Sequence, residues 1–293
     1  MPLLHLRLVQ CERDKKDKPP CMEHESMHGE KIRKESGMFK GRKPINGAPY
    51  WYNTPYKKLD FEWTIEEKLM IDRFCEKIQK NIDEEGGMTP LERWNAAVYG
   101  KEKDRMLVAV STLTTYPTKT LDSHADALKP IDLYKFPKLW IIGHLATVAR
   151  YKLDYANFHN INYGEDMWGG QSNMIDYGNP IIEPPYPVQS IEDLEGMPVP
   201  DPYKDGLYSG YLWANAEYRR ILDEHKLSFP LWGSICPGPD LLVMMGMTGW
   251  TEFAVFLRRK PEMIRKAVGI GAEFLDKFGK AMIDVAKPDG IYM

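Results

Sequence analysis

Three things are scarce in this sequence: cysteine, long apolar runs and an excess of charge of one sign. Its 293 residues include only four cysteines, too few and too scattered for the disulfide framework of a small secreted protein. The net charge of -3 gives no electrostatic reason to expect nucleic acid or an anionic membrane as a partner. No window is long and apolar enough to span a membrane, and Arg7 interrupts the short apolar start, which therefore does not resemble a secretory signal. We therefore expect a cytoplasmic protein with reduced thiols, which binds neither nucleic acid nor a membrane.

Residues 1–60 hold few strongly apolar side chains and many Lys, Glu, Pro and Gly residues. Such a segment buries too little apolar surface to offset the entropy lost on ordering it, and its Lys and Arg outnumber its acidic residues. We therefore predict a flexible basic extension over residues 1–60, followed by a folded domain over residues 61–293. The aromatic stretch PYWYNTPY, residues 49–56, is expected to pin the end of the extension to the domain.

From residue 64 onward, helix signals alternate with short apolar runs. Thr64 and Glu67 form a capping box at the start of an amphipathic helix, and TPLE at residues 89–92 repeats this signal. Further helices are expected over residues 133–152, 208–226, 249–259 and 261–286, and buried strands over residues 104–110, 153–161, 229–235 and 289–293. This alternation predicts a parallel α/β architecture.

Four stretches of the sequence resemble, in order and spacing, the uroporphyrinogen decarboxylase family, whose other branch comprises the corrinoid- and coenzyme M-linked methyltransferases. They are MTPLERWNAAVYGKEKDRMLVAV, SIEDLEGMPVPDP, GPDLLVMMGMTGW and PEMIRKAVGIGAEFLDKFGKAMIDVAKPDGIYM. The resemblance covers residues 88–293 and implies a (β/α)8 TIM barrel with its reaction site at the carboxyl ends of the strands. Such a barrel takes about 250 residues. We therefore expect a barrel that is incomplete at its C-terminus.

The resemblance implies a different chemistry for each branch of the family. The decarboxylases act on a tetra-acid macrocycle, and use arginines to hold its carboxylates and an aspartate to stabilise its pyrrole nitrogens. In this sequence the aspartate position falls on Asn160, the arginine segment contains Lys119 but no arginine, and the tyrosine after the Gly-Pro turn is Met245. These departures favour the methyltransferase branch, in which zinc activates a thiol that accepts a methyl group from a corrinoid. The zinc ligands of that branch include a His-x-Cys pair, which this sequence does not contain.

Polar residues cluster around the end of the strand expected over residues 153–161. Their position on the carboxyl-end face of a barrel makes them candidates for binding a substrate or cofactor. The candidates are His159, Asn160, Asn162, Glu165 and Asp166. The alternative left open is that strand alternation points only half of them inward and that the others are ordinary loop residues.

The combined expectation is a methyltransferase that transfers a methyl group between a corrinoid carrier and a thiol acceptor, and that is inactive as this chain. Two alternatives stay open: uroporphyrinogen decarboxylation in porphyrin biosynthesis, and a non-catalytic barrel that binds a tetrapyrrole. The expected partner is a corrinoid protein or a small tetrapyrrole, and a homo-oligomer is a further option. Two polar residues, His144 on a helix and Asp289 at the start of the last strand, are expected to be structural.

Overall fold

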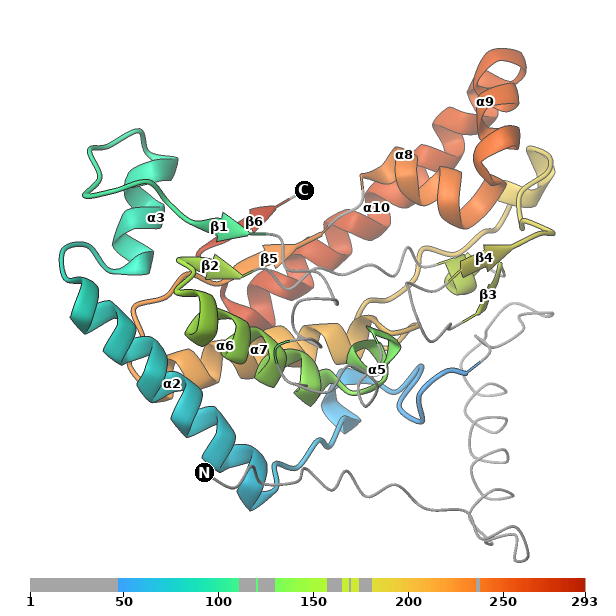
Figure 1. Cartoon of the computed structure of the whole chain (residues 1–293). Coiled ribbons are helices and arrows are strands. Elements are labelled where there is room, and N and C mark those ends of the chain that lie inside the picture. Colours follow the sequence, from blue (N-terminus) through green and yellow to red (C-terminus); the bar gives the residue numbers. More distant parts are fainter. Residues whose placement is uncertain are drawn as a thin grey trace, which may run out of the picture. The chain divides into compact units, whose positions relative to one another are not determined.

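The computed structural model describes residues 47–110, 120, 130–156, 165–168, 170–173, 181–235 and 238–292. The chain divides into two compact units, Met1–Lys40 and Gly41–Met293, and every described residue belongs to the second. Helices hold far more of the described residues than strands do (Figure 1). The described part is therefore rich in α-helix, with less strand than the sequence predicts.

The two helix starts predicted from capping boxes are confirmed. Helix α2 (Ile65–Glu85) begins after Thr64, whose hydroxyl accepts the Glu67 N–H, while the Glu67 carboxylate accepts the Thr64 N–H. Helix α3 (Pro90–Val98) begins after Thr89 with the same pair of hydrogen bonds. Each box satisfies N–H groups that have no partner inside the helix, so it fixes the residue at which the helix begins.

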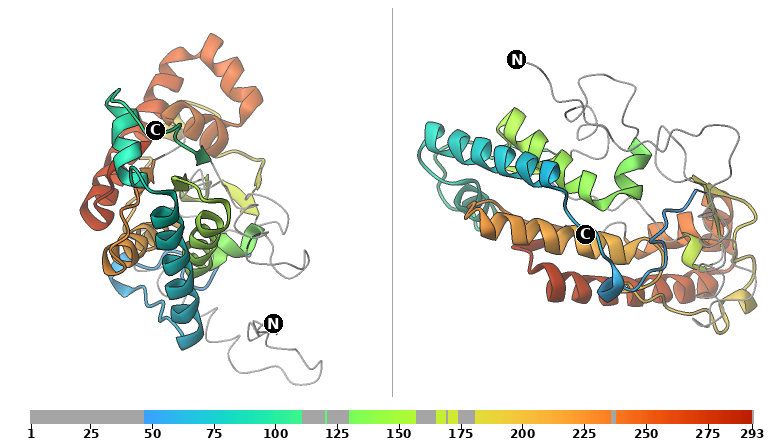
Figure 2. Two further views of the ribbon diagram at one scale, coloured as in Figure 1. Left: turned by 60° about the vertical axis from the view of Figure 1, so that its left-hand side comes forward. Right: turned by 90° about the horizontal axis from the view of Figure 1, so that it is seen from below.

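Four further helices build most of the core. They are α5 (Pro130–Lys135), α6 (Pro137–Tyr151), α7 (Tyr208–Glu224) and α10 (Pro261–Ala286). Helix α6 packs against α2 and α7, and α7 packs against α10, so α2, α6, α7 and α10 lie side by side in that order (Figure 2). The helix expected over residues 133–152 is present, but Pro137 begins a new helix within it.

Four short strands form two parallel pairs. Strand β1 (Ala109–Val110) pairs with β2 (Tyr155–Ala156), and β5 (Trp232–Ser234) pairs with β6 (Gly290–Tyr292). The chain passes through α5 and α6 between the strands of the first pair, and through several helical segments that end with α10 between those of the second. Each pair is therefore a βαβ unit, and the parallel direction predicted from the sequence is confirmed for both.

The first strand is shorter and more exposed than the sequence predicts. Of the buried strand expected over residues 104–110, only β1 forms, and both of its residues are exposed. The side chains of Met106 and Val108 are 83% and 40% exposed. The prediction of burial is wrong because, among the described residues, β1 has a neighbouring strand on one side only. The first residues of the run belong instead to an ionic cluster described below.

Shorter elements connect these parts. They are η1 (Tyr56–Lys58), η2 (Glu165–Trp168), the antiparallel strands β3 (Gln171–Asn173) and β4 (Ile181–Glu183), η3 (Glu192–Leu194), α8 (Pro239–Leu242), the π-helical turn η4 (Val243–Thr248) and α9 (Trp250–Arg259). Within the part of the chain that the structure describes, no single helix has the length and apolar character to cross a membrane. One pair bent by 112°, Pro239–Thr248 with Trp250–Arg259, passes by length and composition.

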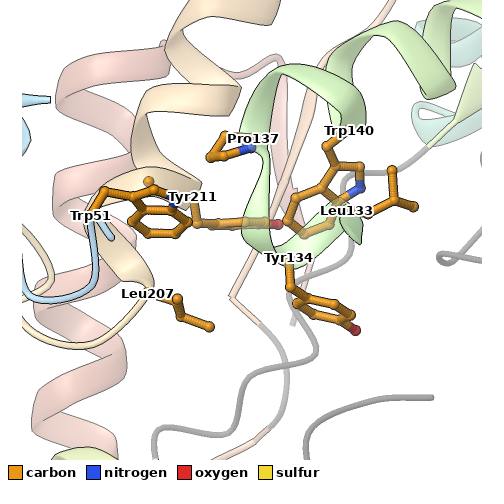
Figure 3. Close-up of a pocket in the computed structure, with 8 residues that line it drawn as sticks. Trp51, Leu133, Tyr134, Pro137, Trp140, Leu207 and Tyr211 are labelled. Carbon is orange, nitrogen blue, oxygen red and sulfur yellow. The ribbon is translucent and has the colours of Figure 1, made fainter. Parts of the chain in front are cut away.

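Residues 47–63, here called the strap, are held against α5 and α7. The Trp51 indole Nε1 donates to the Lys135 carbonyl oxygen at 2.8 Å, and its ring rests on Gly210 of α7. Figure 3 shows Trp51 beside Tyr211 in a hollow that has room for no more than a water-sized molecule. Since Trp51 is 3% exposed, the aromatic stretch does pin the strap to the helices, as predicted.

Replacement of Gly210 by alanine is expected to loosen the strap. A Cβ at this position would lie 2.4 Å from the Trp51 ring, so the indole would have to move. We expect Gly210→Ala to lower the free energy of unfolding in urea by about 1–3 kcal/mol, the usual cost of overpacking. Gly269→Ala in α10 is the control, because a Cβ there meets no atom within 4 Å. It should stabilise the protein by up to about 1 kcal/mol, and equal losses in both variants would contradict the packing explanation.

Candidate functional site

Trp94 of α3 lies between the two parallel strand pairs. Its ring centroid is 4.6 Å from that of Tyr155 in β2 and 4.7 Å from that of Trp232 in β5. The two pairs therefore share one face, here called the inner face, on which the three aromatic rings pack. Figure 1 shows the four strands close together, with α3 on the side where they begin.

Alternation along β5 sends Trp232 and Ser234 to the inner face and Gly233 to the opposite side. A Cβ on Gly233 would lie 2.7 Å from Met282 of α10, so the absence of a side chain lets β5 pack closely on the helix. On the inner face Gly290, the register partner of Trp232 in β6, leaves room for the indole, because a Cβ there would lie 2.6 Å from the ring. Two glycines thus set the position of β5.

Three polar groups of the inner face have no hydrogen-bond partner among the described residues. They are the indole Nε1 groups of Trp94 and Trp232 and the hydroxyl of Ser234, and all three atoms are buried. Ser234 is 1% exposed and is the last residue of β5, at its carboxyl end. A buried polar group without a partner costs roughly 1–3 kcal/mol. A bound molecule that carries carboxylate or amide oxygens would satisfy these donors.

The amino-terminal ends of β1 and β2 are held by a cluster of ion pairs, here called the ionic cluster. Fully buried Arg93 donates to Asp104 at 2.6 and 2.8 Å and to Asp154 at 2.5 Å. Arg105 donates to Asp154 at 2.6 Å and to Glu85, at the end of α2, at 2.8 Å. Hydrogen bonds from Arg93 hold the pKa of Asp104 below its usual value, and those from Arg105 lower the pKa of Glu85. The cluster therefore joins α2, α3 and the starts of two strands.

Two polar residues expected to be structural have that role. Asp289 Oδ2, just before β6, accepts the Leu231 N–H at 2.8 Å and the Arg219 guanidinium at 2.6 Å, which ties the starts of β5 and β6 to α7. His144 is fully buried in α6, with its Nδ1 2.8 Å from the Trp140 carbonyl oxygen. Both residues therefore fix the packing of the elements around the inner face.

The ligand-binding residues predicted from the sequence lie only in part within the described structure. The three that lie outside it are His159, Asn160 and Asn162. Glu165 and Asp166 form the first half of η2, which is anchored by the buried side chains of Met167 and Trp168. Since η2 contacts η4, which follows the carboxyl end of β5, its backbone lies on the same side of the strands as Ser234.

The metal site that the resemblance implies has no counterpart in the described residues. No group of three His, Cys, Asp or Glu side chains among them is arranged to hold a metal ion. Cys75, the free thiol of α2, is buried, and burial raises its pKa to about 12, so it is not a thiolate near neutral pH.

Sequence reasoning did not identify Ser234 or the place of Trp94. A signal for Ser234 exists, because it is a polar residue near the end of the apolar run FPLWGSI and so belongs to the strand-end class already used to choose candidates. Trp94 has no comparable signal, since a tryptophan in an amphipathic helix is typical of ordinary core packing. That its indole N–H has no acceptor within the described part of the chain is visible only in three dimensions.

A comparison with models of known protein families finds no match to this chain, and neither does a comparison with curated proteins. The function proposed below therefore depends on the sequence motifs and on the geometry of the inner face.

Removal of the buried cation is expected to destabilise the protein strongly. Arg93→Met leaves the buried carboxylate of Asp154 without one of its two arginines, and loss of one partner of a buried pair costs about 3–5 kcal/mol. Arg220→Met in α7 is the matched control, because Arg220 also bonds two carboxylates but its side chain is 53% exposed. It should cost about 1 kcal/mol or less. Urea denaturation of both variants measures the difference, and similar losses would show that the cluster does not hold α3 in place.

Proposed function

We propose that this chain forms part of a (β/α)8 TIM barrel of the uroporphyrinogen decarboxylase type, and that its inner face binds a corrinoid. Two βαβ units with parallel strands support this fold. The packing of Trp94 against β2 and β5 supports it further, because the interior of a small barrel is filled with side chains.

The observation that carries the proposal is the set of unpaired polar groups on the inner face. A corrinoid bears amide side chains around its ring, and their oxygens accept hydrogen bonds from donors such as those of Trp94, Trp232 and Ser234, which have no partner among the described residues. Ser234 lies at the carboxyl end of its strand, where barrels of this class bind ligands. Asn160, with its uncharged amide, is proposed as a further contact from the segment after β2.

For a protein that contains the whole barrel we propose methyl transfer between the corrinoid and a thiol, which is the reaction that the sequence resemblance implies. The residues of this chain do not fit the zinc ion that activates the thiol, because the sequence has no His-x-Cys pair and the described residues hold no metal-binding group. No step through zinc is therefore assigned to this chain. Its own residues bind and orient the corrinoid, with the Ser234 hydroxyl and the two indoles as donors.

Uroporphyrinogen decarboxylation is the second candidate, and the same unpaired groups favour it to a lesser degree. The carboxylates of uroporphyrinogen also accept hydrogen bonds. This reaction, however, needs a carboxylate to stabilise a cationic ring, and the corresponding position holds Asn160. A non-catalytic barrel that binds a tetrapyrrole would use the same contacts without either reaction.

Replacement of Ser234 by alanine is expected to weaken corrinoid binding. Titration of the protein with aquocobalamin, followed by the absorbance of the corrin ring, should show about a 2- to 10-fold loss of affinity, the value of one hydrogen bond. Ser209→Ala is the matched control, because Ser209 in α7 is also fully buried and its hydroxyl also lacks a partner among the described residues. It should leave the affinity unchanged. Equal affinity of the two variants for aquocobalamin would contradict binding at the inner face.

Two incubations test whether this chain by itself catalyses either reaction. Incubation with methylcobalamin and a thiol should give no loss of methylcobalamin absorbance, with or without added zinc, because this chain lacks the His-x-Cys pair. Incubation with uroporphyrinogen should leave its four acetate groups intact, as measured by chromatography of the oxidised porphyrins. Loss of carboxyl groups from uroporphyrinogen would favour uroporphyrinogen decarboxylation over methyl transfer as the function. Failure to bind either aquocobalamin or uroporphyrin would contradict ligand binding altogether.

A further inference from the structure

Helix α9 exposes a ridge that has a tryptophan at one end and an arginine at the other. None of its residues is buried, although its ten residues include five large apolar side chains. Trp250, Ala254 and Arg258 follow one another at intervals of four, so they form a continuous ridge along one face, and all three are exposed. The Trp250 side chain is 60% exposed, and Leu257, beside the ridge, is 54% exposed. Trp250 and Leu257, seven residues apart, lie on the same side of the helix, and exposed apolar side chains that lie together are typical of surfaces that contact another molecule.

The helix that carries this ridge is held firmly in place. Gly249 begins it with a φ of 78°, a conformation that glycine adopts without strain, and a Cβ there would lie 2.3 Å from the Tyr186 ring. Just before the corner, the Val188 N–H donates to the Met247 carbonyl oxygen at 2.9 Å. The other side of α9 packs onto the protein through Phe256, which Lys260 covers at 5.2 Å from the ring centroid. The ridge therefore faces solvent on a helix that is fixed in place. Helix α9 lies in the upper right of Figure 1.

We propose that this ridge pairs with the same ridge of a second copy of the chain, with the two α9 helices antiparallel across a twofold axis. Ala254 lies at the axis, where its small side chain lets the helices approach closely. Trp250 of each copy then lies at the level of Arg258 of the other, and a guanidinium over an indole ring is the strongest common cation–π pair.

The ridge fits a second copy better than an acidic partner because its chemistry is complementary to itself. Arg258 makes no ion pair with any described residue, so its guanidinium is available for the indole of another copy. The exchange is reciprocal, as an isologous interface requires, and it leaves no ridge residue unmatched. One helix pair buries less than the roughly 1,200 Å² of a standard stable interface. The dimer is therefore weak and reversible.

Sedimentation equilibrium over a range of protein concentrations tests this pairing. The native chain should show a monomer–dimer equilibrium. Trp250→Ala and Arg258→Ala should each weaken it by about 5- to 30-fold, because each variant removes both copies of the contact. Arg259→Ala is the matched control, since Arg259 is an exposed neighbour that lies off the ridge, and it should leave the equilibrium unchanged.

Two further variants separate specific pairing from general stickiness. Ala254→Leu adds exposed apolar surface but blocks close approach, so it should weaken the dimer; a stronger association would overturn the proposal. The double variant Trp250→Arg with Arg258→Trp exchanges the two partners and should restore the dimer that either single change removes. Unchanged thermal unfolding of each variant shows that the fold is kept.

A chain that stays monomeric at all concentrations overturns the pairing. So does co-sedimentation with vesicles of phosphatidylcholine and phosphatidylserine that depends on Trp250, because the ridge would then insert into an anionic membrane surface.

Discussion

One turn of α3 carries both the buried cation and the aromatic ring around which the strands are arranged. The guanidinium of Arg93 has no exposed surface, and burial of an unpaired charge would cost several kcal/mol. The helix can therefore occupy its place only with the carboxylates of Asp104 and Asp154 in contact with Arg93. Trp94, the next residue, then projects between β2 and β5. By fixing α3, the ionic cluster thus fixes the position of the Trp94 ring on the inner face.

Strands of two or three residues do not hold together by their own hydrogen bonds. The first pair depends on the ionic cluster, which reaches α2 through Glu85, and on α6, which contacts β2. The second pair depends on Asp289 and on the close packing of Gly233 against α10. In both pairs the helices and the buried charges set the position of the strands, which explains why helix dominates the described structure.

The parts of the fold that local signals specify are the parts that the sequence predicts well. The capping boxes at Thr64 and Thr89 require only residues three apart, and both helices begin where these residues place them. The extent of a strand depends instead on its neighbours, so the apolar run ending at Val110 looks like a buried strand although most of it is exposed. For the candidate site, the strand-end rule points to the carboxyl ends of the strands, and three of the residues that it selects, His159, Asn160 and Asn162, lie outside the described structure. The rule does not reveal Ser234, because a missing hydrogen-bond partner is a property of the packed structure.

The buried guanidinium of Arg93 at the amino-terminal end of the strands is paired with carboxylates, whereas the buried Ser234 hydroxyl at the carboxyl end of β5 has no partner among the described residues. The indoles of Trp94 and Trp232, nearer the amino-terminal end, also lack a described partner, so the proposed ligand site at the carboxyl end depends on Ser234. An alanine there would fold at least as well, so stability alone does not favour serine. In the proposed (β/α)8 barrel, the amino-terminal face would contribute stability and the carboxyl-terminal face would contact the ligand, and an unpaired hydroxyl at the carboxyl end of β5 agrees with that division. A molecule that accepts hydrogen bonds from the inner face would therefore stabilise the fold as it binds, because it supplies partners that the described residues do not.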